Sequence, residues 1–340
     1  MDMPGRQGWP PPFESFRADD RGMRLRALRD GLIITGWLCL GFVFFVVIPL
    51  VHSLGYDAFA YWSIDPSDLY GRAMDNTAAL GALRYTPPFA LLSLPFTLLP
   101  WWLFIWLYGA LMLAALTWLG GRWTLVMLAL PPVALELYHG NVHLLIAAAI
   151  VLGFRYPWSW AFVVLTKVTP GIGLIWFAVR REWRSLAIAL AATGLCALLA
   201  FVIWPNSWSE WSAMIISNLN VPAPYTAPYP WVRIAAAAVL VAWGGLTDRP
   251  WTVAIAAMLA LPTLSPLGVS VALGAVPLLR RGDRAALRPD WRDAVQPRKL
   301  LLSLGAFLGG ALVLALVFAG PISQLIDWAS SNLFQQYPLR

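Results

Sequence analysis

The chain has 340 residues, of which 59% are hydrophobic and 12% charged, and its mean hydropathy is +0.66. Soluble domains typically contain about 45–50% apolar and about 25% charged residues, so this composition excludes a soluble enzyme, a disordered chain and a secreted disulfide scaffold. It predicts an all-α polytopic membrane protein.

The apolar runs predict about eleven transmembrane helices, within a range of roughly nine to twelve, because each crossing needs about 20 residues. Several central runs are shorter than that, which is typical of broken or re-entrant helices. In chain order the runs are Gly31–Val51, Pro88–Pro100, Trp101–Leu119, Trp123–Tyr138, Asn141–Phe154, Pro157–Val179, Ser185–Trp204, Val232–Leu246, Trp251–Pro262, Leu267–Leu279 and Leu300–Gly320.

The net charge of +7 does not predict nucleic-acid binding, because Arg and Lys cluster beside apolar runs, in residues 1–30, 180–184 and 280–299. Basic loops of this kind face the cytoplasm. We therefore expect a cytoplasmic N-terminal tail over residues 1–30, a multispan domain over residues 31–320 with a basic cytoplasmic loop at 280–299, and an outer C-terminal tail over residues 321–340. The simplest location is a bacterial plasma membrane, with the first apolar run retained as a helix.

Two outer loops follow from this orientation, at residues 52–87 and 205–231. In the first loop, Asp65 precedes a proline and is followed three residues later by Asp68, a pattern typical of a helix start. It predicts a helix from Pro66 to about Leu83, lying along the membrane surface. The second loop is rich in Trp, Pro and Tyr, which is typical of the membrane–water interface.

Asp57 is the first candidate for chemistry. It lies just beyond the first apolar run, between His52 and Tyr61 in an aromatic-rich segment. A carboxylate held at the membrane boundary among aromatic rings can have its pKa tuned for work as a general base. The alternative is a solvated loop acid. We count His52 and Tyr61 as candidate substrate-binding residues.

Lys167 is the second candidate, because it lies near the middle of the run Pro157–Val179. A lysine at this depth costs about 2.5–3.5 kcal/mol on insertion scales and marks a functional site by default. Pro170 predicts a break in the helix close by. A cation beside a broken helix suits a lipid phosphate. The alternatives are a structural ion pair with Glu136, or a side chain that reaches toward the interface.

Polar residues also crowd a hinge between two short apolar runs, where Glu136, His139, Asn141 and His143 lie close together in the sequence. A Glu-x-x-His pattern occurs in di-metal helical proteins, but there it is present in two copies. The single copy here favours a hydrogen-bonded hinge near substrate, with Asn141 and His143 as binding residues and no metal.

Arg84 and Tyr85 close the first outer loop, before two prolines that fix the chain as it re-enters the membrane. The guanidinium of Arg84 could bind a phosphate in a bidentate manner. The alternative is an interfacial anchor. We count both residues as candidates for substrate binding.

Taken in order, these short motifs resemble glycosyltransferase family 87, a bacterial family of α-mannosyltransferase-like multispan proteins in the GT-C superfamily. The resemblance covers roughly residues 30–280 and includes two departures: Asn141 stands where the family usually has Gln, and Leu267 follows the late Ser-Pro where Trp and His are common. The matching segments are Tyr56–Tyr61, Tyr85–Pro88, Gly140–His143, Lys167–Pro170, Arg180–Arg184 and Ser265–Pro266.

The resemblance implies a GT-C-like fold and a glycosyltransferase that takes a mannose-like sugar from a polyprenyl phosphate. The acceptor would be a lipid or glycan on the outer side of the membrane, and no further cofactor is implied. Asp57 would be the base, with Arg84 and Lys167 near the lipid phosphate. Two other classes stay open, a transporter or flippase of a lipid-linked substrate, and a catalytically silent member of an envelope-glycan assembly. Substitution of Asp57 would distinguish the glycosyltransferase from the other two classes, because only the enzyme would require this carboxylate.

Overall fold

The computed structural model describes residues 54–75, 79–128, 130–218 and 229–280, with a few further residues between positions 30 and 38. These residues form helices and loops and contain no strand. With its apolar composition, the chain is a helical membrane protein. The prediction of an all-α fold is confirmed for the part that is described.

Most of the described helices are short, and α6 and α12 are the longest. Several begin at a proline, including α5, α8, α14 and η6, because proline is preorganised for the first helical position and has no N–H to lose there. The α-helices are α3 (Tyr56–Trp62), α4 (Gly71–Asp75), α5 (Pro87–Ser93), α6 (Trp101–Gly120), α7 (Thr124–Leu128), α8 (Pro131–His139), α9 (His143–Gly153), α10 (Trp160–Thr166), α11 (Ile175–Val179), α12 (Trp183–Ile203), α13 (Ser207–Asn218), α14 (Pro230–Leu246), α15 (Trp251–Leu259) and α16 (Ala275–Arg280). The 3-10 helices are η2 (Leu94–Leu98), η3 (Gly121–Trp123), η4 (Pro157–Ser159), η5 (Thr169–Leu174) and η6 (Pro266–Gly274).

Two of the described helices, α6 and α12, are long and apolar enough to cross a membrane. The helices α8 and α9 are bent by 106° and could together make a third, broken span or a re-entrant loop. The count of about eleven spans is not confirmed and stays a prediction. The predicted runs Gly31–Val51 and Leu300–Gly320, the basic loop and both tails lie mostly or wholly outside the described residues.

The predicted span Pro157–Val179 is broken, as Pro170 led us to expect. It contains η4, α10, η5 and α11. The backbone of Lys167 is extended, with φ −140° and ψ 114°, and this ends α10. Pro170 then lies in η5, because its ring and missing N–H do not allow the α-helix to continue.

The predicted surface helix from Pro66 to Leu83 is wrong. The Oδ1 atom of Asp68 accepts a hydrogen bond from the backbone N–H of Gly71 at 2.8 Å, so the helix α4 starts five residues later than predicted. The Asp65 carboxylate accepts instead from the N–H of Ser67 at 2.9 Å, which makes a turn rather than a helix cap.

Most apolar side chains of this loop that were expected to face the membrane surface are buried in the protein, although Met74 is exposed. Leu69, Tyr70, Ala73 and Leu83 are buried in the main core. They pack beneath the loop, so its hydrophobic pattern reflects tertiary packing. The described residues between 54 and 87 therefore form a folded segment that packs on the helices.

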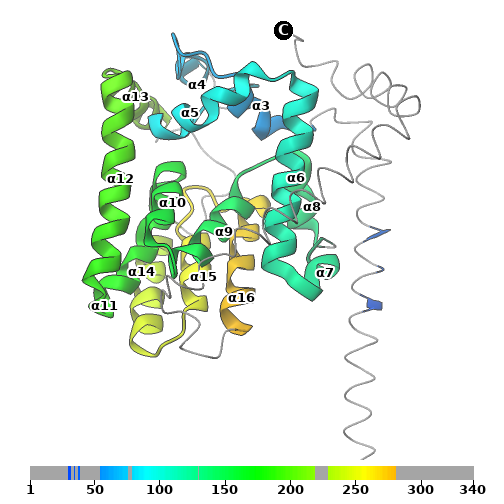
Figure 1. Ribbon diagram of the computed structural model, residues 1–340, viewed down its shortest axis with the longest axis vertical. Helices are drawn as coiled ribbons and strands as arrows, with labels where there is room; N and C mark the ends of the chain where they lie inside the picture. Colours follow the sequence, from blue (N-terminus) through cyan, green and yellow to red (C-terminus); the bar gives the residue numbers. More distant parts are fainter. Residues whose placement is uncertain are drawn as a thin grey trace, which may run out of the picture.

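Figure 1 shows how the elements are arranged. The helices α3, α4, α5 and α13 gather at one end, and α11, α14 and α16 lie toward the other. The long helix α12 runs along one side, and α9, α10 and α15 lie between α12 and α6. Only Ala189 and Ala200 of α12 are buried, so most of its apolar surface faces outward.

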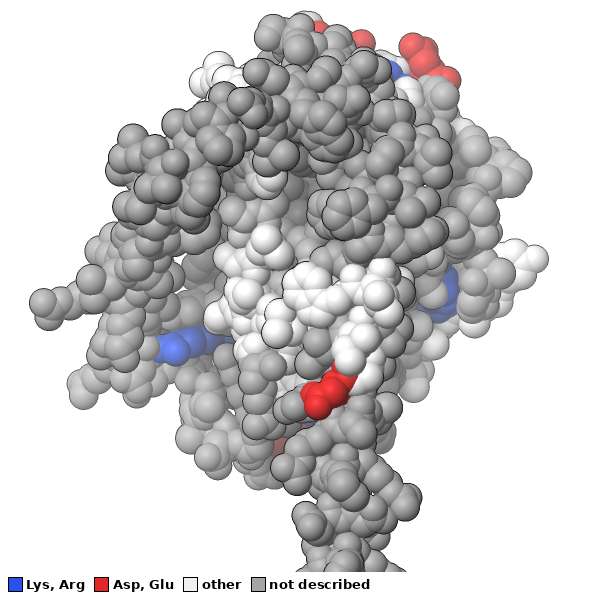
Figure 2. Space-filling model, turned by 90° about the vertical axis from the view of Figure 1, so that its right-hand side faces the viewer, with Lys and Arg blue, Asp and Glu red and all other residues white. Residues whose placement is uncertain are grey.

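The outer surface fits contact with lipid. On the face drawn in Figure 2, the described surface is mainly uncharged and carries few acidic or basic side chains. Many large apolar side chains of α12 are exposed, and Leu195 and Val202 are each 68% exposed. In lipid such exposure has no hydrophobic cost, because the surroundings are themselves apolar.

Candidate functional site

The hinge between α8 and α9 holds the site together. Gly140 ends α8 with φ +67°, a left-handed conformation that glycine adopts without strain. A Cβ atom at Gly140 would lie 2.6 Å from the Cβ of Ala58, so only glycine allows α3 to approach this closely. The N–H of Gly55 also donates to the carbonyl of Tyr138 at 2.8 Å. The hinge therefore positions α3, which carries Asp57.

Glu136 closes the bend from the other side. It is fully buried. Its Oε1 atom accepts hydrogen bonds from the backbone N–H groups of His143 at 2.6 Å and Leu144 at 3.3 Å, which are the first residues of α9. A carboxylate at this place satisfies N–H groups that the helix leaves unpaired and interacts favourably with its dipole. Glu136 thus caps α9.

The same carboxylate begins a chain of polar contacts that ends at Lys167. Oε2 of Glu136 lies 2.9 Å from Nδ1 of His143, and Nε2 of His143 lies 2.7 Å from Nζ of Lys167. An ammonium group can only donate, so Nε2 accepts, and Nδ1 carries the proton that is donated to Glu136. The ion pair between Lys167 and Glu136, one of the alternatives for this lysine, is therefore indirect, since His143 lies between them.

A wall of aromatic rings lies next to Lys167. Nζ of Lys167 lies 5.9 Å from the centre of the Tyr85 ring, within the range of a cation–π contact. The hydroxyl groups of Tyr85 and Tyr61 are 2.9 Å apart. Burial raises the pKa of both phenols above its ordinary value, so both stay protonated at neutral pH. The structure thus brings three predicted site residues, Lys167, Tyr85 and Tyr61, into one cluster.

Asp57 lies at the edge of this cluster, in the first turn of α3. Its side chain is 13% exposed, and its Oδ2 atom lies 3.9 Å from Nδ1 of His139, too far for a hydrogen bond. Within the described ranges no hydrogen bond holds this carboxylate. Its negative charge contributes to the raised pKa of Tyr61 and Tyr85. A carboxylate that is anchored by its helix and has free oxygen atoms can accept a proton from a bound hydroxyl group.

Arg84, the residue before Tyr85, is exposed. Burial raises the pKa of Tyr56, and the nearby charge of Arg84 opposes that rise. The cation therefore lies near α3, on the same side as Asp57. An exposed guanidinium at this place has the chemistry to bind an anionic group.

Asn141 has a structural task in the hinge. Its Oδ1 atom accepts a hydrogen bond from the N–H of Val142 at 2.7 Å, and its carbonyl lies 3.4 Å from the hydroxyl group of Tyr108. His52 lies outside the described residues. The predicted binding roles of both residues stay predictions.

The sequence analysis did not include two residues of this cluster, Glu136 and Tyr108, among the candidate site residues. Glu136 was considered as an ion-pair partner of Lys167, but its capping of α9 depends on the bend, which periodicity does not show. Tyr108 lies in the middle of α6, where its ring contacts that of Tyr61 at 5.8 Å. A phenol inside an apolar run was the only sequence signal for it. Across the described part of the chain, no group of three His, Cys, Asp or Glu could hold a metal ion.

Comparison with known proteins gives a family match and one curated relative. Residues 83–295 match glycosyltransferase family 87. A polyprenol-phosphate-mannose-dependent α-(1-2)-phosphatidylinositol mannoside mannosyltransferase from Mycobacterium tuberculosis (strain ATCC 25618 / H37Rv) is 28% identical over 91 residues. That alignment covers 24% of this chain and about a fifth, 21%, of the relative. No solved structure matches the chain. Because the family match covers more than half of its residues, the chain belongs to glycosyltransferase family 87.

Proposed function

We propose that the protein is a membrane glycosyltransferase that moves a mannose-like sugar from polyprenyl phosphate to a lipid or glycan acceptor. The reaction would take place on the outer face of a bacterial plasma membrane, with the N-terminus in the cytoplasm. Family membership and the name of the mycobacterial relative support this activity and this donor. The observation that carries the proposal is a carboxylate and a cation at one aromatic cluster. Within the described residues Asp57 accepts no hydrogen bond and its charge acts on Tyr85, and the half-buried Lys167 lies beside the ring of Tyr85.

Lys167 would bind the phosphate of the donor. An ammonium group has three protons to donate, and His143 accepts one of them. The remaining donors and the charge can serve a phosphate, which is favourable in surroundings that exclude water. As the bond from the sugar to the phosphate breaks, negative charge builds on the leaving phosphate, and Lys167 and Arg84 would stabilise it.

Asp57 would act on the acceptor. Its carboxylate takes the proton of the acceptor hydroxyl group while that oxygen forms a bond to the anomeric carbon of the sugar. The bond from that carbon to the phosphate breaks on the opposite face, and polyprenyl phosphate leaves with the electron pair. The configuration at the anomeric carbon is inverted, and no cofactor is needed for this balance.

A lipid-linked-substrate transporter is the second candidate, because the chain from Glu136 to Lys167 could bind a lipid phosphate without any reaction. A silent partner in an envelope-glycan assembly is the third, since Leu267 replaces the Trp or His that usually follows the Ser-Pro motif.

The test is glycosyl transfer by the full chain in proteoliposomes. Radiolabelled polyprenyl-phosphate mannose, glucose and galactose would be supplied with a total lipid extract as acceptor, and nucleotide sugars would serve as control donors. We expect label to move from one polyprenyl phosphate to a new product. Movement of intact donor across the membrane without a new product would favour the transporter. Neither transfer nor movement would favour the silent partner.

A further inference from the structure

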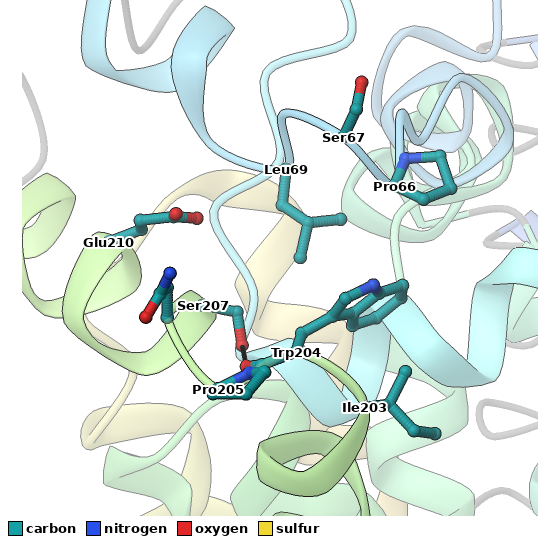
Figure 3. A pocket seen from close by; sticks show the side chains of 9 residues that line it. Pro66, Ser67, Leu69, Ile203, Trp204, Pro205, Ser207 and Glu210 are labelled. Carbon is teal, nitrogen blue, oxygen red and sulfur yellow. Dashed lines mark hydrogen bonds between the residues drawn. The ribbon is translucent and has the colours of Figure 1, made fainter.

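A polar cavity lies apart from the cluster at Lys167. Its volume is about 200 Å³, and it lies at the end of the molecule where α4, α5 and α13 gather. Figure 3 shows that its walls come from the loop before α4, the end of α12 and the start of α13. The lining residues are Pro66, Ser67, Leu69, Ile203, Trp204, Pro205, Asn206, Ser207 and Glu210.

The cavity combines apolar walls with a few free polar groups. Trp204 and Leu69 form the apolar part. Within the ranges that the structure describes, the amide of Asn206 and the carboxylate of Glu210 have no hydrogen-bond or ion-pair partner. Ser207, by contrast, donates to the carbonyl of Trp204 at 2.7 Å, which fixes the turn between α12 and α13. Both side chains are exposed, so they are available to a ligand, and the turn that carries Asn206 has a fixed backbone.

This chemistry suits one sugar ring. A pyranose has an apolar face of C–H groups, which packs on an indole, and a rim of hydroxyl groups, which bind to carboxylates and amides. Glu210 can accept two hydroxyl protons, and Asn206 can both donate and accept. The volume is below the roughly 300–1,000 Å³ of pockets for drug-sized ligands, so it fits a single ring better than a lipid chain.

The cavity is also linked to the candidate site through one residue. Leu69, in its wall, is followed by Tyr70, whose hydroxyl group donates to the carbonyl of Tyr85 at 2.9 Å. The ring of Tyr85 then faces Lys167. The cavity wall and the aromatic cluster are therefore joined by this hydrogen bond, one residue along the chain from Leu69.

We propose that this cavity binds a sugar unit of a glycan acceptor, through Trp204, Asn206 and Glu210. The assignment rests on the proposed glycosyltransferase function and makes it more specific, because it gives the acceptor a carbohydrate part that is recognised away from the reacting hydroxyl group. The residues would set acceptor affinity and take no part in the bond exchange.

The first test measures binding alone, in the full chain with Asp57→Asn so that no turnover occurs. Methyl α-D-mannopyranoside, methyl α-D-glucopyranoside and methyl α-D-galactopyranoside would be examined by saturation-transfer NMR in detergent micelles. We expect a signal for at least one glycoside, which disappears in the added double variant Asn206→Ala, Glu210→Gln and persists with Ser212→Ala, an exposed control on α13. The absence of signal for all three glycosides, or a signal that the double variant leaves unchanged, would overturn the assignment.

The second test measures kinetics in otherwise unmodified protein. If transfer occurs, Glu210→Gln should raise KM for the acceptor about tenfold with little change in kcat, the loss expected for one hydrogen bond to a charged group. A fall in kcat with unchanged KM would overturn the inference. Because glycoside binding needs no turnover, failure of transfer in the wild type would count against the proposed function and leave the binding result to decide this site.

Discussion

The continuous helices and the broken helices of this protein have opposite surroundings. The helix α12 runs unbroken for 21 residues, and only two alanines in it are buried. Where α8 bends into α9, the fully buried residues include a glutamate and a histidine, Glu136 and His143. A second break, after α10, places Lys167 against that histidine. Polar chemistry is therefore found where the helices end, and apolar surface where they continue.

The difference has a physical reason. A buried charge is costly unless hydrogen bonds and partner charges surround it. A continuous helix offers no backbone partner, because its N–H groups are already used, whereas the start of α9 offers two to Glu136. In a membrane, irregular backbone is tolerated where it is buried in protein or lines a cavity. The helix breaks thus provide hydrogen-bond partners for the buried polar side chains and determine where the candidate site lies.

The strongest expected effect is at Asp57. Asp57→Asn keeps the size of the side chain and removes its basicity, so transfer should fall by about 10²–10⁴-fold, the range for loss of a general base. Transfer rates in proteoliposomes at matched protein amounts would measure this. Asp75→Asn, an exposed acid at the end of α4, is the matched control and should retain full activity. Equal rates for wild type and Asp57→Asn would remove this residue from the mechanism.

Lys167→Met should have the second largest effect. The substitution keeps an unbranched side chain and removes the cation, so KM for the donor should rise by about 10–100-fold, as expected when a charged contact to phosphate is lost. Donor titration with fixed acceptor would measure it. Arg249→Met, an exposed cation that stacks on Trp243, should not change donor KM. If both variants behaved alike, the effect of Lys167 would be one of general charge.

Glu136→Gln separates charge from shape at the hinge. The neutral amide can still accept from the start of α9, but it no longer balances Lys167 through His143. We expect donor KM to rise by up to about tenfold, together with a lower unfolding temperature in detergent. Glu182→Gln, at a partly exposed ion pair with Arg180, should change neither quantity much. A Glu136→Gln protein with wild-type stability and donor KM would contradict a role for the charge of Glu136, because the amide keeps the hydrogen bonds of the cap.

The smallest expected effects come from two glycines, Gly140 at the hinge and Gly194 in the continuous helix α12. Gly140→Ala adds a methyl group 2.6 Å from Ala58 at φ +67°, and should destabilise the protein by about 1–3 kcal/mol and reduce transfer, because α3 must move. Gly194→Ala, in α12, meets nothing within 4 Å. It should be neutral or stabilise by up to about 1 kcal/mol, since glycine is the weaker helix former. Thermal unfolding in detergent distinguishes the two, and equal effects would show that the hinge is not tightly packed.

Several site residues could be predicted from the sequence because their placement is anomalous there. A lysine inside an apolar run and a proline three residues later predicted a polar site and a helix break. The structure has the break at Lys167 and Pro170, and it places Lys167 against His143, while its role in binding stays a prediction. The histidine and asparagine after Gly140 predicted a polar hinge. These features involve residues that are close in the sequence, so they can be recognised from the sequence alone.

The rest depended on contacts that a pattern does not contain. The prediction of a helix from Pro66 was wrong because Asp65 and Asp68 were both suitable residues for a helix start. The N–H of Gly71 is paired with Asp68, the later of the two acids. The apolar residues that follow are buried by tertiary packing rather than by the membrane surface. The link from Glu136 to Lys167 joins residues 31 positions apart through a bend of 106°, which hydrophobic periodicity could not show.

Photo-crosslinking tests the central claim most directly, that the broken helices bind a polyprenyl-phosphate donor. The full chain in proteoliposomes would be irradiated with a polyprenyl phosphate that carries a photoreactive group beside the phosphate, and the labelled peptides identified by mass spectrometry. We predict label within residues 136–143 or 165–170, lost when unlabelled polyprenyl phosphate competes and reduced by Lys167→Met. Label confined to α12, or unchanged by Lys167→Met, would contradict the account.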